Sequence, residues 1–383
     1  MDERQLLMIP GPTPVPQSIL LSGARAMVNH RGPEVAKLMA DCTAGLKWAF
    51  QTQHYAFILT CSGTGGLEAA VVNTLSPGDK VLSVSIGVFG DRLATIAKTY
   101  GAQVDSLSFA YGAAADPQQI KPRLAADTGK EIKAVLITQN ETSTGVCNDL
   151  ATIGPMVREH GALLIVDAIS SLLAMDSQMD NWGLDVVVAG SQKAFMIPPG
   201  LCFVAVSDRA MAAVEASTTP RFYLDLKRAR QYLEQGQTPW TPAVPLIWQL
   251  GDALKMIEAE GLQTSFARHA RLARMTRAGV KALGLTLFAA EESRASNAVT
   301  SIRRPEGIAT ADLRKLMRDK YSIVISGGQG KIKDDIFRIG HLGLVGEKEI
   351  IATLGCLGLA LRELGRPVDP AAGVAAAMDA MGG

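Results

Sequence analysis

Short apolar runs alternate with helical patterns over residues 55–206. Runs rich in Val, Ile, Leu and Ala predict strands at 56–60, 81–85, 104–109, 134–138, 163–166, 185–189 and 201–206. Periodic apolar positions between these runs predict helices at 66–73, 89–100, 117–126 and 150–160. Strands that are apolar on both faces and alternate with helices are typical of a parallel sheet covered by helices on both sides. This part of the chain therefore predicts an α/β fold.

The two ends of the chain show other patterns. Alternating prolines over 9–16 exclude a helix and predict an extended arm at 1–16, either a stiff linker or a segment that crosses to another part of the fold or to a partner subunit. Helical periodicity covers 17–52 and, with a weak point at Gly261, 246–283. Strands at 298–302, 322–326 and 336–339 and helices at 309–320 and 348–361 then predict an α+β region. We therefore expect a large domain at 17–262, a small domain at 263–383, and a tail that frays after Pro367.

Composition narrows the class of protein. A chain of 383 residues is too long for one ordinary core, and 48% hydrophobic and 20% charged residues are typical of a soluble globular enzyme. A net charge of +1 gives no sign of a nucleic-acid or membrane partner. Five cysteines without ligand spacing argue for reduced thiols and against a metal site. The charged N-terminus has no signal-peptide pattern, so we expect a cytoplasmic protein.

One lysine lies in an unusual place. Lys193 occupies a polar turn between the predicted strands at 185–189 and 201–206. A buried ammonium is costly unless it is paired or neutralised, and a Schiff base with an aldehyde cofactor would neutralise it. On this segment alone, a surface loop lysine is an equally good interpretation.

Two other strand ends carry candidate chemistry. The stretch 61–66, Cys-Ser-Gly-Thr-Gly-Gly, joins a strand to a helix and suits a phosphate, although a plain tight turn would look similar. Asp167 ends an apolar strand, where open α/β sheets bind ligands, although it could instead cap a helix. The 26 residues from Asp167 to Lys193 leave room for one connection and one strand, so both side chains should meet at the same edge of the sheet.

Two further features fit the same edge. Phe89 follows a strand and offers a surface on which an aromatic ring could stack, although it could equally be a core residue. The polar loop 140–145 offers hydroxyls and N–H groups to the same edge, although it could equally be an ordinary connection. A phosphate cradle, an aromatic platform, an acid for a ring nitrogen and a reactive lysine together meet the requirements of pyridoxal 5′-phosphate catalysis.

The motifs resemble one family throughout the chain. The sequence is similar to the class V, fold-type I aminotransferases, specifically the alanine–glyoxylate and serine–glyoxylate group. It also resembles cyanobacterial members, some of which carry the label "soluble hydrogenase small subunit". The matching motifs occur in family order at 10–13, 62–65, 141–146, 166–168, 191–193, 198–201 and 337–343.

This resemblance implies a fold, a cofactor and residue roles. The fold is a large domain with a mainly parallel sheet between helices plus a smaller C-terminal α+β domain, the cofactor is pyridoxal 5′-phosphate, and no metal is implied. Lys193 matches the Schiff-base lysine and Asp167 the partner of the pyridinium nitrogen, the two catalytic positions. The matching cofactor-binding positions are Thr64, Gly65, Gly66, Phe89, Thr142, Asp167, Gln192, Lys193 and Thr241. The matching substrate-binding positions are Arg338, which would hold the carboxylate, and Gly11 and Thr142.

The resemblance also implies an assembly and an activity. Thr241 matches a residue that reaches the phosphate of the neighbouring subunit, so we expect a homodimer with shared active sites. Thr238 lies where relatives often have tyrosine, and its contact with the cofactor stays open. The implied reaction moves the amino group of alanine or serine to glyoxylate.

Several alternatives remain at this point. They are another 2-oxo acid as acceptor, aminoethylphosphonate as donor, cysteine desulfuration, and a non-enzymatic subunit of a redox complex. Desulfuration requires a mobile nucleophilic cysteine, whereas Cys356, near the small-domain end of the chain, lies in an apolar helical pattern.

Overall fold

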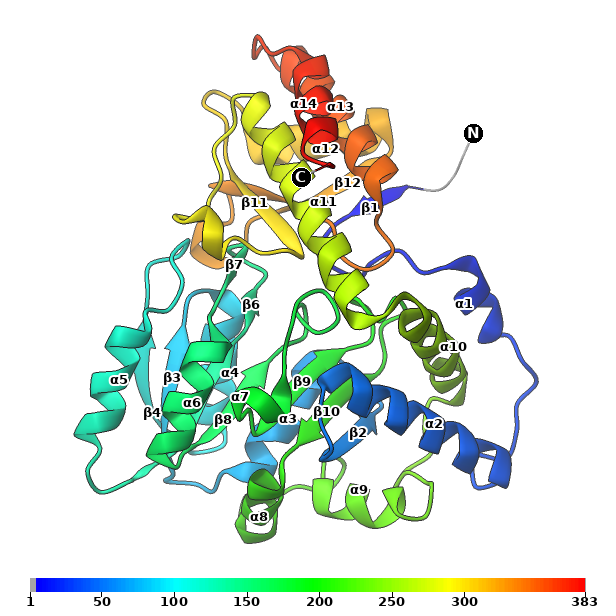
Figure 1. The fold of residues 1–383 in the computed structure, drawn as a ribbon, viewed down its shortest axis with the longest axis vertical. Coiled ribbons are helices and arrows are strands. Elements are labelled where there is room, and N and C mark those ends of the chain that lie inside the picture. Colours follow the sequence, from blue (N-terminus) through cyan, green and yellow to red (C-terminus); the bar gives the residue numbers. More distant parts are fainter. Residues whose placement is uncertain (1–4, 383) are drawn as a thin grey trace.

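A seven-stranded sheet forms the centre of the large domain (Figure 1). The computed structural model describes residues 5–382. The spatial order of the strands is β2-β10-β9-β8-β5-β3-β4, and in this sheet only β10 runs against the direction of the others. The strands are Tyr55–Leu59 (β2), Lys80–Ser85 (β3), Gln103–Ser108 (β4), Ile132–Thr138 (β5), Leu163–Asp167 (β8), Val186–Gly190 (β9) and Cys202–Val206 (β10).

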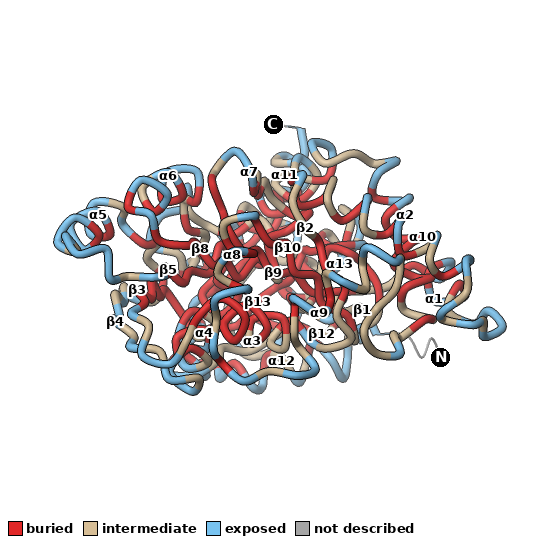
Figure 2. The backbone as a smooth tube through the Cα atoms, turned by 90° about the horizontal axis from the view of Figure 1, so that it is seen from below, coloured by how far each residue is buried: buried red, intermediate tan, exposed pale blue. Residues whose placement is uncertain are grey.

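Helices cover both faces of this sheet, and Figure 2 shows its strands buried between them. Val187 and Ala189 of β9 face one core and Val186 and Val188 the other, as the two-residue period of a strand requires. The first core is covered by α2 (Pro33–Phe50), α5 (Pro117–Ala126), α6 (Leu150–His160) and α10 (Val244–Glu260). The second is covered by α3 (Gly63–Thr74), α4 (Val88–Thr99), α8 (Asp208–Ala216) and α9 (Leu226–Leu233).

The small domain has its own sheet and core, at the top of Figure 1. Its strands are β1 (Leu6–Met8), β12 (Ile323–Gly327), β13 (Ile336–Gly340) and β11 (Val299–Arg303), in that spatial order. Its helices are α11 (Leu262–Ala282), α12 (Thr310–Tyr321), α13 (Glu347–Glu363) and α14 (Pro370–Asp379). The short elements of the chain are α1 (Gln17–Ser22), β6 (Asn140–Glu141), β7 (Val146–Cys147), α7 (Met179–Trp182), η1 (Glu292–Arg294) and η2 (Gly330–Ile332).

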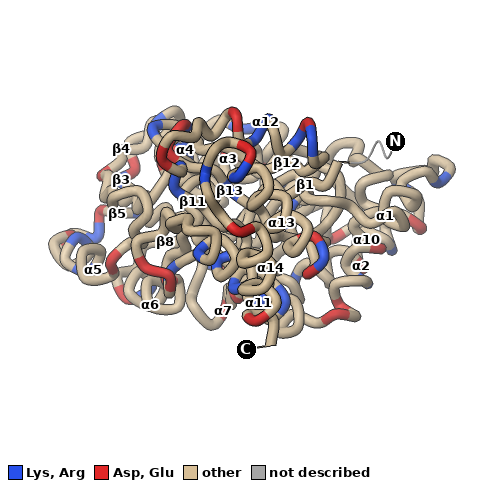
Figure 3. The backbone as a smooth tube through the Cα atoms, turned by 90° about the horizontal axis from the view of Figure 1, so that it is seen from above, with Lys and Arg blue, Asp and Glu red and all other residues tan. Residues whose placement is uncertain are grey.

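The predicted fold class is confirmed, and most predicted elements lie within a few residues of the observed ones. The largest shift at a functional position concerns α3, which begins at Gly63 rather than at residue 66. The helical pattern at 17–52 divides into α1 and α2, because Gly32 and Pro33 start a new helix. Basic and acidic residues are interspersed over the outside (Figure 3), and no helix among residues 5–382 is long and apolar enough to cross a membrane.

The N-terminal arm crosses to the small domain. Residues 9–16 contain no helix, and β1 pairs with β12 in parallel, with Leu7 opposite Val324. Residues 1–4 of the predicted arm lie outside the described residues. Gly261 separates α10 from α11, next to the predicted boundary at 262, and the division into 1–16, 17–262 and 263–383 stays a prediction.

The prediction that the tail frays after Pro367 is wrong. Residues 370–379 form α14, whose start is capped by the Asp369 carboxylate, which accepts a hydrogen bond of 3.0 Å from the Ala371 N–H. Gly373 and Ala377 are buried against α11 and α13. A Cβ on Gly373 would lie 2.8 Å from Leu283 Cγ, so the small residues that suggested disorder allow close helix packing instead.

Two glycines of α13 test whether α14 is docked. A Cβ at Gly355 would meet nothing closer than Val374 Cγ2 at 3.5 Å. Gly355→Ala should therefore increase the free energy of unfolding by about 1 kcal/mol through helix propensity, and raise the melting temperature. A Cβ at Gly358 would lie 2.7 Å from Pro370 Cα at the start of α14, so Gly358→Ala should lower stability by about 1–3 kcal/mol. Thermal unfolding of the two variants measures the difference. Equal stabilisation by both would mean that α14 is not packed on α13.

Candidate active site

A cavity of about 120 Å³ opens where the strands of the large sheet end. Because all strands but β10 share one direction, the carboxyl ends of β2, β5, β8 and β9 meet at one edge, where open α/β sheets bind ligands. Six predicted site residues line the cavity: Thr64, Phe89, Thr142, Asp167, Gln192 and Lys193. The remaining lining residues are Ser62, Gly63, Leu67, Arg92, Asn140, Ile169 and Ser170.

The N-terminal arm covers Lys193 directly. The Lys193 Nζ donates a hydrogen bond of 2.8 Å to the Pro10 carbonyl, and Thr13 Oγ1 donates one of 2.9 Å to the Lys193 carbonyl. Gly11 has a φ of +146°, and a Cβ there would collide with the lysine side chain. The predicted substrate position Gly11 therefore lies against the lysine, where a larger residue would displace the amine.

Burial brings the pKa values of the lysine and the acid close together. Loss of hydration lowers the pKa of Lys193 to about 8, the charge of Arg338 adds to this effect, and the Asp167 carboxylate opposes it. Burial raises the pKa of Asp167 to about 7, against a hydrogen bond of 3.0 Å that its Oδ1 accepts from the Ile169 N–H. Both pKa values therefore lie close to neutral pH, the range that suits acid–base catalysis.

The start of α3 presents backbone N–H groups to the cavity. Ser62 is the N-cap residue and its hydroxyl caps nothing, while Ser62, Gly63 and Thr64 all line the cavity. The first N–H groups of a helix have no acceptor within the helix, so they suit an anion. The Gly66 N–H already donates to the Ser62 carbonyl at 3.2 Å.

Gly65 and Gly66 do not line the cavity. A Cβ on Gly65 would lie 2.8 Å from Cys61 Sγ, and one on Gly66 would lie 2.7 Å from Val188 Cγ1. These two glycines thus allow α3 to approach the sheet. Their predicted contact with the cofactor stays a prediction.

Glu141 organises the loop that follows β5. Its Oε2 accepts hydrogen bonds from the N–H groups of Phe89, at 3.1 Å, and Gly90, at 3.0 Å, and its Oε1 accepts the Ser143 hydroxyl at 2.5 Å. The carboxylate therefore caps α4, a role that the N-cap residue Gly87 cannot fill because it has no side chain. A Cβ on Gly87 would occupy the space that the Glu141 side chain takes. Burial raises the pKa of Glu141, although these donors favour its charged form. The result is a fixed position for Phe89, the predicted stacking residue.

Arg338 lies behind the cavity wall and contacts Thr142, which lines the cavity. It lies on β13 with 4% of its surface exposed, and its guanidinium donates to the Thr142 carbonyl at 2.7 Å and to the Gly327 carbonyl at 2.8 Å. Burial lowers the pKa of Arg338 to about 10, while the charge of Glu141 opposes this shift. Arg338 itself does not line the cavity described above. The Thr142 hydroxyl, in turn, lies 2.7 Å from Ser170 Oγ.

Four residues of the cavity wall lie outside the predicted motifs and site positions, namely Leu67, Arg92, Ile169 and Ser170. The Arg92 guanidinium lies 4.8 Å from the centre of the Phe89 ring and donates to Thr64 Oγ1 at 3.4 Å. Ile169 adds an apolar surface and Ser170 a hydroxyl. Arg92 follows Phe89 by three positions on one helix, and Ile169 and Ser170 come directly after the Asp167 strand, so their spacing was the available signal.

Thr241 lies away from Lys193 within this chain. It is exposed and borders a second cavity, together with Thr60 and Trp240. Thr238 donates to the Trp240 carbonyl at 2.6 Å and borders the same second cavity. Neither threonine is brought to the lysine by its own chain.

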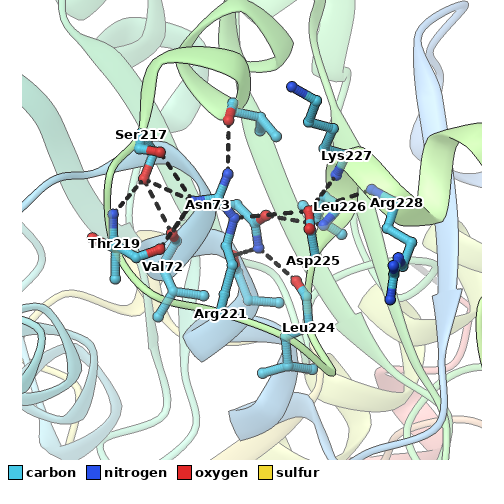
Figure 4. A network of polar contacts seen from close by, with 12 residues as sticks. Val72, Asn73, Ser217, Thr219, Arg221, Leu224, Asp225, Leu226, Lys227 and Arg228 are labelled. Carbon is cyan, nitrogen blue, oxygen red and sulfur yellow. Dashed lines mark hydrogen bonds and ion pairs between the residues drawn. The ribbon is translucent and has the colours of Figure 1, made fainter.

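A polar network fixes the segment that leads to Thr241 (Figure 4). Asn73, at the end of α3, donates to the Leu224 carbonyl at 2.6 Å and accepts from the Leu226 N–H at 2.9 Å. Arg221 donates to the Ser217 and Thr219 carbonyls, at 3.2 and 3.1 Å. The first turn of α3 therefore lines the Lys193 cavity, while its last turn, through Asn73, holds the segment at 224–226.

Comparison with known proteins agrees with this geometry. The family described as Aminotransferase class-V matches residues 18–332. The chain is 48% identical to a protein of Synechococcus sp. named "Soluble hydrogenase, small subunit", over 98% of each chain. It is 38% identical to L-aspartate–glyoxylate aminotransferase of Paracoccus denitrificans, over 99% of this chain and 96% of that one.

A solved structure agrees in fold. The alanine–glyoxylate aminotransferase of Nostoc sp. superposes with a TM-score of 0.90 at 27% identity, over 94% of this chain and 96% of that one. The family match covers residues 18–332, most of the chain, and includes every residue named above as lining the Lys193 cavity. The chain therefore belongs to the class V aminotransferases, enzymes of fold type I that use pyridoxal 5′-phosphate.

Proposed function

We propose that this aminotransferase moves the amino group of a small amino acid, alanine or serine, to glyoxylate, and that Lys193 binds the cofactor covalently. The observation that carries the proposal is the Lys193 amine, held beside Asp167 with a pKa lowered to about 8. The names of two similar proteins support glyoxylate as acceptor, since both contain it while their donors differ, aspartate in one and alanine in the other.

The residues around the cavity fit the cofactor. The N–H groups at 62–64 suit its phosphate, Phe89 and Ile169 supply apolar surfaces for a flat ring, and Asp167 suits a protonated ring nitrogen. Gln192 Oε1 is buried and has no hydrogen-bond partner among residues 5–382, as expected of a group whose partner is a ligand. When bound, pyridoxal phosphate supplies an electron-withdrawing ring that acidifies the Cα–H of an amino acid.

The chain's own residues then perform binding and proton transfer. A neutral Lys193 amine takes a proton from the substrate Cα and returns it, for which a pKa near the working pH is best. Arg338 supplies a planar guanidinium for the substrate carboxylate. The arm at Pro10 and Gly11 keeps water from the amine.

We also propose a homodimer in which Thr241 serves the partner's site. Phe222 and Tyr223 expose 69% and 49% of their surface next to Trp240, and an exposed aromatic cluster of this kind suits a protein contact. A fully active monomer in light scattering would contradict this assembly. The cytoplasmic location stays a prediction.

Other functions remain to be tested against this one. The Paracoccus relative suggests aspartate as donor, and the name of the Synechococcus relative suggests a subunit of a redox complex. A redox subunit without this cofactor would leave the lysine, the acid and the cradle with no ligand to bind.

Half-reactions with single substrates distinguish these functions. We expect the purified protein to show the visible absorbance of lysine-bound cofactor, to lose it on addition of alanine or serine, and to regain it fastest with glyoxylate. Aspartate, aminoethylphosphonate and 2-oxoglutarate serve as comparison substrates. A faster reaction with 2-oxoglutarate would make the acceptor wrong, and a protein that binds no cofactor would make the whole proposal wrong.

Arg338 should affect the substrate more than the fold. Arg338→Ala removes a charge-assisted contact at a buried site, so we expect catalytic efficiency to fall about 30- to several-thousand-fold, which corresponds to about 2–5 kcal/mol. The cofactor absorbance should stay normal, and Arg338→Lys should recover only part of the activity.

A second buried arginine provides the control. Arg277, 8% exposed, donates to the Ser296 carbonyl and lies outside the Lys193 cavity. Arg277→Ala should lower the melting temperature and leave the Michaelis constant for the amino acid unchanged. The same behaviour of Arg338→Ala would mean that Arg338 is only structural.

The lowered pKa of Lys193 predicts a pH dependence. A lysine attacks an aldehyde in its neutral form, so the rate at which the cofactor-free protein binds pyridoxal phosphate should rise with pH to about 8 and then level off. With an ordinary lysine, the rate would continue to rise until the pH approaches the usual lysine pKa of 10.5.

Asp167→Asn provides the matched variant. Its carboxylate favours the ammonium form of Lys193, so its removal should move the midpoint to lower pH. Stopped-flow absorbance measures both profiles, and Lys193→Ala should give no signal. An unchanged midpoint in Asp167→Asn would contradict the electrostatic coupling.

A further inference from the structure

Two cysteine sulfurs lie in contact beneath the start of α3. Cys61 follows β2, and Cys202 opens β10, the antiparallel neighbour of β2, with Cys202 opposite Leu59. The two Sγ atoms are 3.2 Å apart. A disulfide requires a sulfur–sulfur distance of about 2.0 Å. The two Sγ atoms would therefore have to approach each other by about 1.2 Å to form one.

We propose that Cys61 and Cys202 form a peroxide-reactive thiol pair, and that their disulfide weakens anion binding at the start of α3. The two cysteines have different roles. Cys61 is half-buried and accessible, whereas Cys202 is fully buried. Cys61 is therefore the residue that meets the oxidant, and Cys202 the one that completes the disulfide.

The electrostatic setting supports this order. The hydrogen bond with the Cys202 thiol lowers the pKa of Cys61, and the same contact, together with burial, raises the pKa of Cys202. The nearby helix start also favours a thiolate at Cys61. Burial raises the pKa of Cys42 and Cys147 to about 12, and burial also raises that of Cys356. These three thiols should react more slowly.

The chemistry balances with hydrogen peroxide as the oxidant. The Cys61 thiolate attacks one peroxide oxygen, the O–O bond breaks, and water leaves after protonation, with a sulfenic acid formed on Cys61. The Cys202 sulfur then attacks the Cys61 sulfur, the S–O bond breaks, and a second water leaves with the thiol proton. The two thiols lose two electrons, which reduce one peroxide to two waters.

The glycines of α3 connect this pair to the cavity. A Cβ on Gly65 would lie 2.8 Å from Cys61 Sγ, and a Cβ on Gly66 would lie 2.8 Å from Cys202 Sγ. The first turn of α3 therefore rests on the two sulfurs with no free space. When the sulfurs move together, this turn moves as well, and with it residues 62–64, which line the cavity. This second step rests on the proposed phosphate position.

Peptide mass spectrometry without reductant tests the thiol pair. After treatment of the cofactor-free and cofactor-loaded protein with hydrogen peroxide, we expect a Cys61–Cys202 cross-linked peptide that dithiothreitol reverses. Cys202→Ser should instead accumulate a sulfenic acid on Cys61 that dimedone traps, and Cys61→Ser should give neither product. Cys356→Ser, which removes a half-buried thiol elsewhere, should leave the cross-link unchanged. Absence of the cross-link, with Cys356 oxidised as fast as Cys61, would overturn the proposal.

A binding titration tests the effect on α3. We expect the cross-linked protein to bind pyridoxal phosphate about tenfold more weakly than the reduced protein, the effect of a weakened hydrogen bond to a charged group. Cys202→Ser treated in the same way should keep its affinity. Equal affinities of the cross-linked and reduced proteins would overturn the link to α3. Failure of the reduced protein to bind the cofactor would instead contradict the proposed function, whatever the state of the thiols.

Discussion

Burial of the Lys193 amine is the constraint on which the candidate active site depends. An ammonium loses its hydration in this cavity, and the Pro10 carbonyl and the Asp167 carboxylate replace it only in part, so the pKa falls to about 8. The acid experiences the opposite effect, with a pKa raised to about 7. Burial thus leaves the Lys193 amine partly neutral near pH 8, where an ordinary lysine is fully charged.

Another buried carboxyl group, that of Glu141, links the two sides of the cavity. Its carboxylate caps α4 and holds Phe89, while the next residue, Thr142, offers its carbonyl to Arg338 of the small domain. One short loop after β5 therefore sets both the aromatic surface and the position of the arginine.

The sequence predicts the parts of this arrangement that depend on local pattern. Continuous apolar runs indicate the buried strands, and Asp167 and Lys193 follow from their places at strand ends. It does not predict which residues of the glycine-rich turn line the cavity, because in a helix that starts at Gly63 rather than at 66 the residues Gly65 and Gly66 lie against Cys61 and Val188. It also does not predict the hydrogen bond from Arg92 to Thr64 or the packing of α14 on α11, because these partners are far apart along the chain.

The N-terminal arm couples the lysine to the small domain. Gly340, at the end of β13, leaves room for the Ile9 backbone, since a Cβ there would collide with it, and β1 just before is a strand of the small-domain sheet. The Pro10 carbonyl that accepts the Lys193 hydrogen bond is thus carried by the small domain, whereas the lysine follows a strand of the large one. A movement of β12 and β13 relative to β9 must therefore move this carbonyl relative to the amine. The packing of the two domains therefore contributes to the burial that lowers the pKa of Lys193, since the arm that covers the amine belongs to the small-domain sheet.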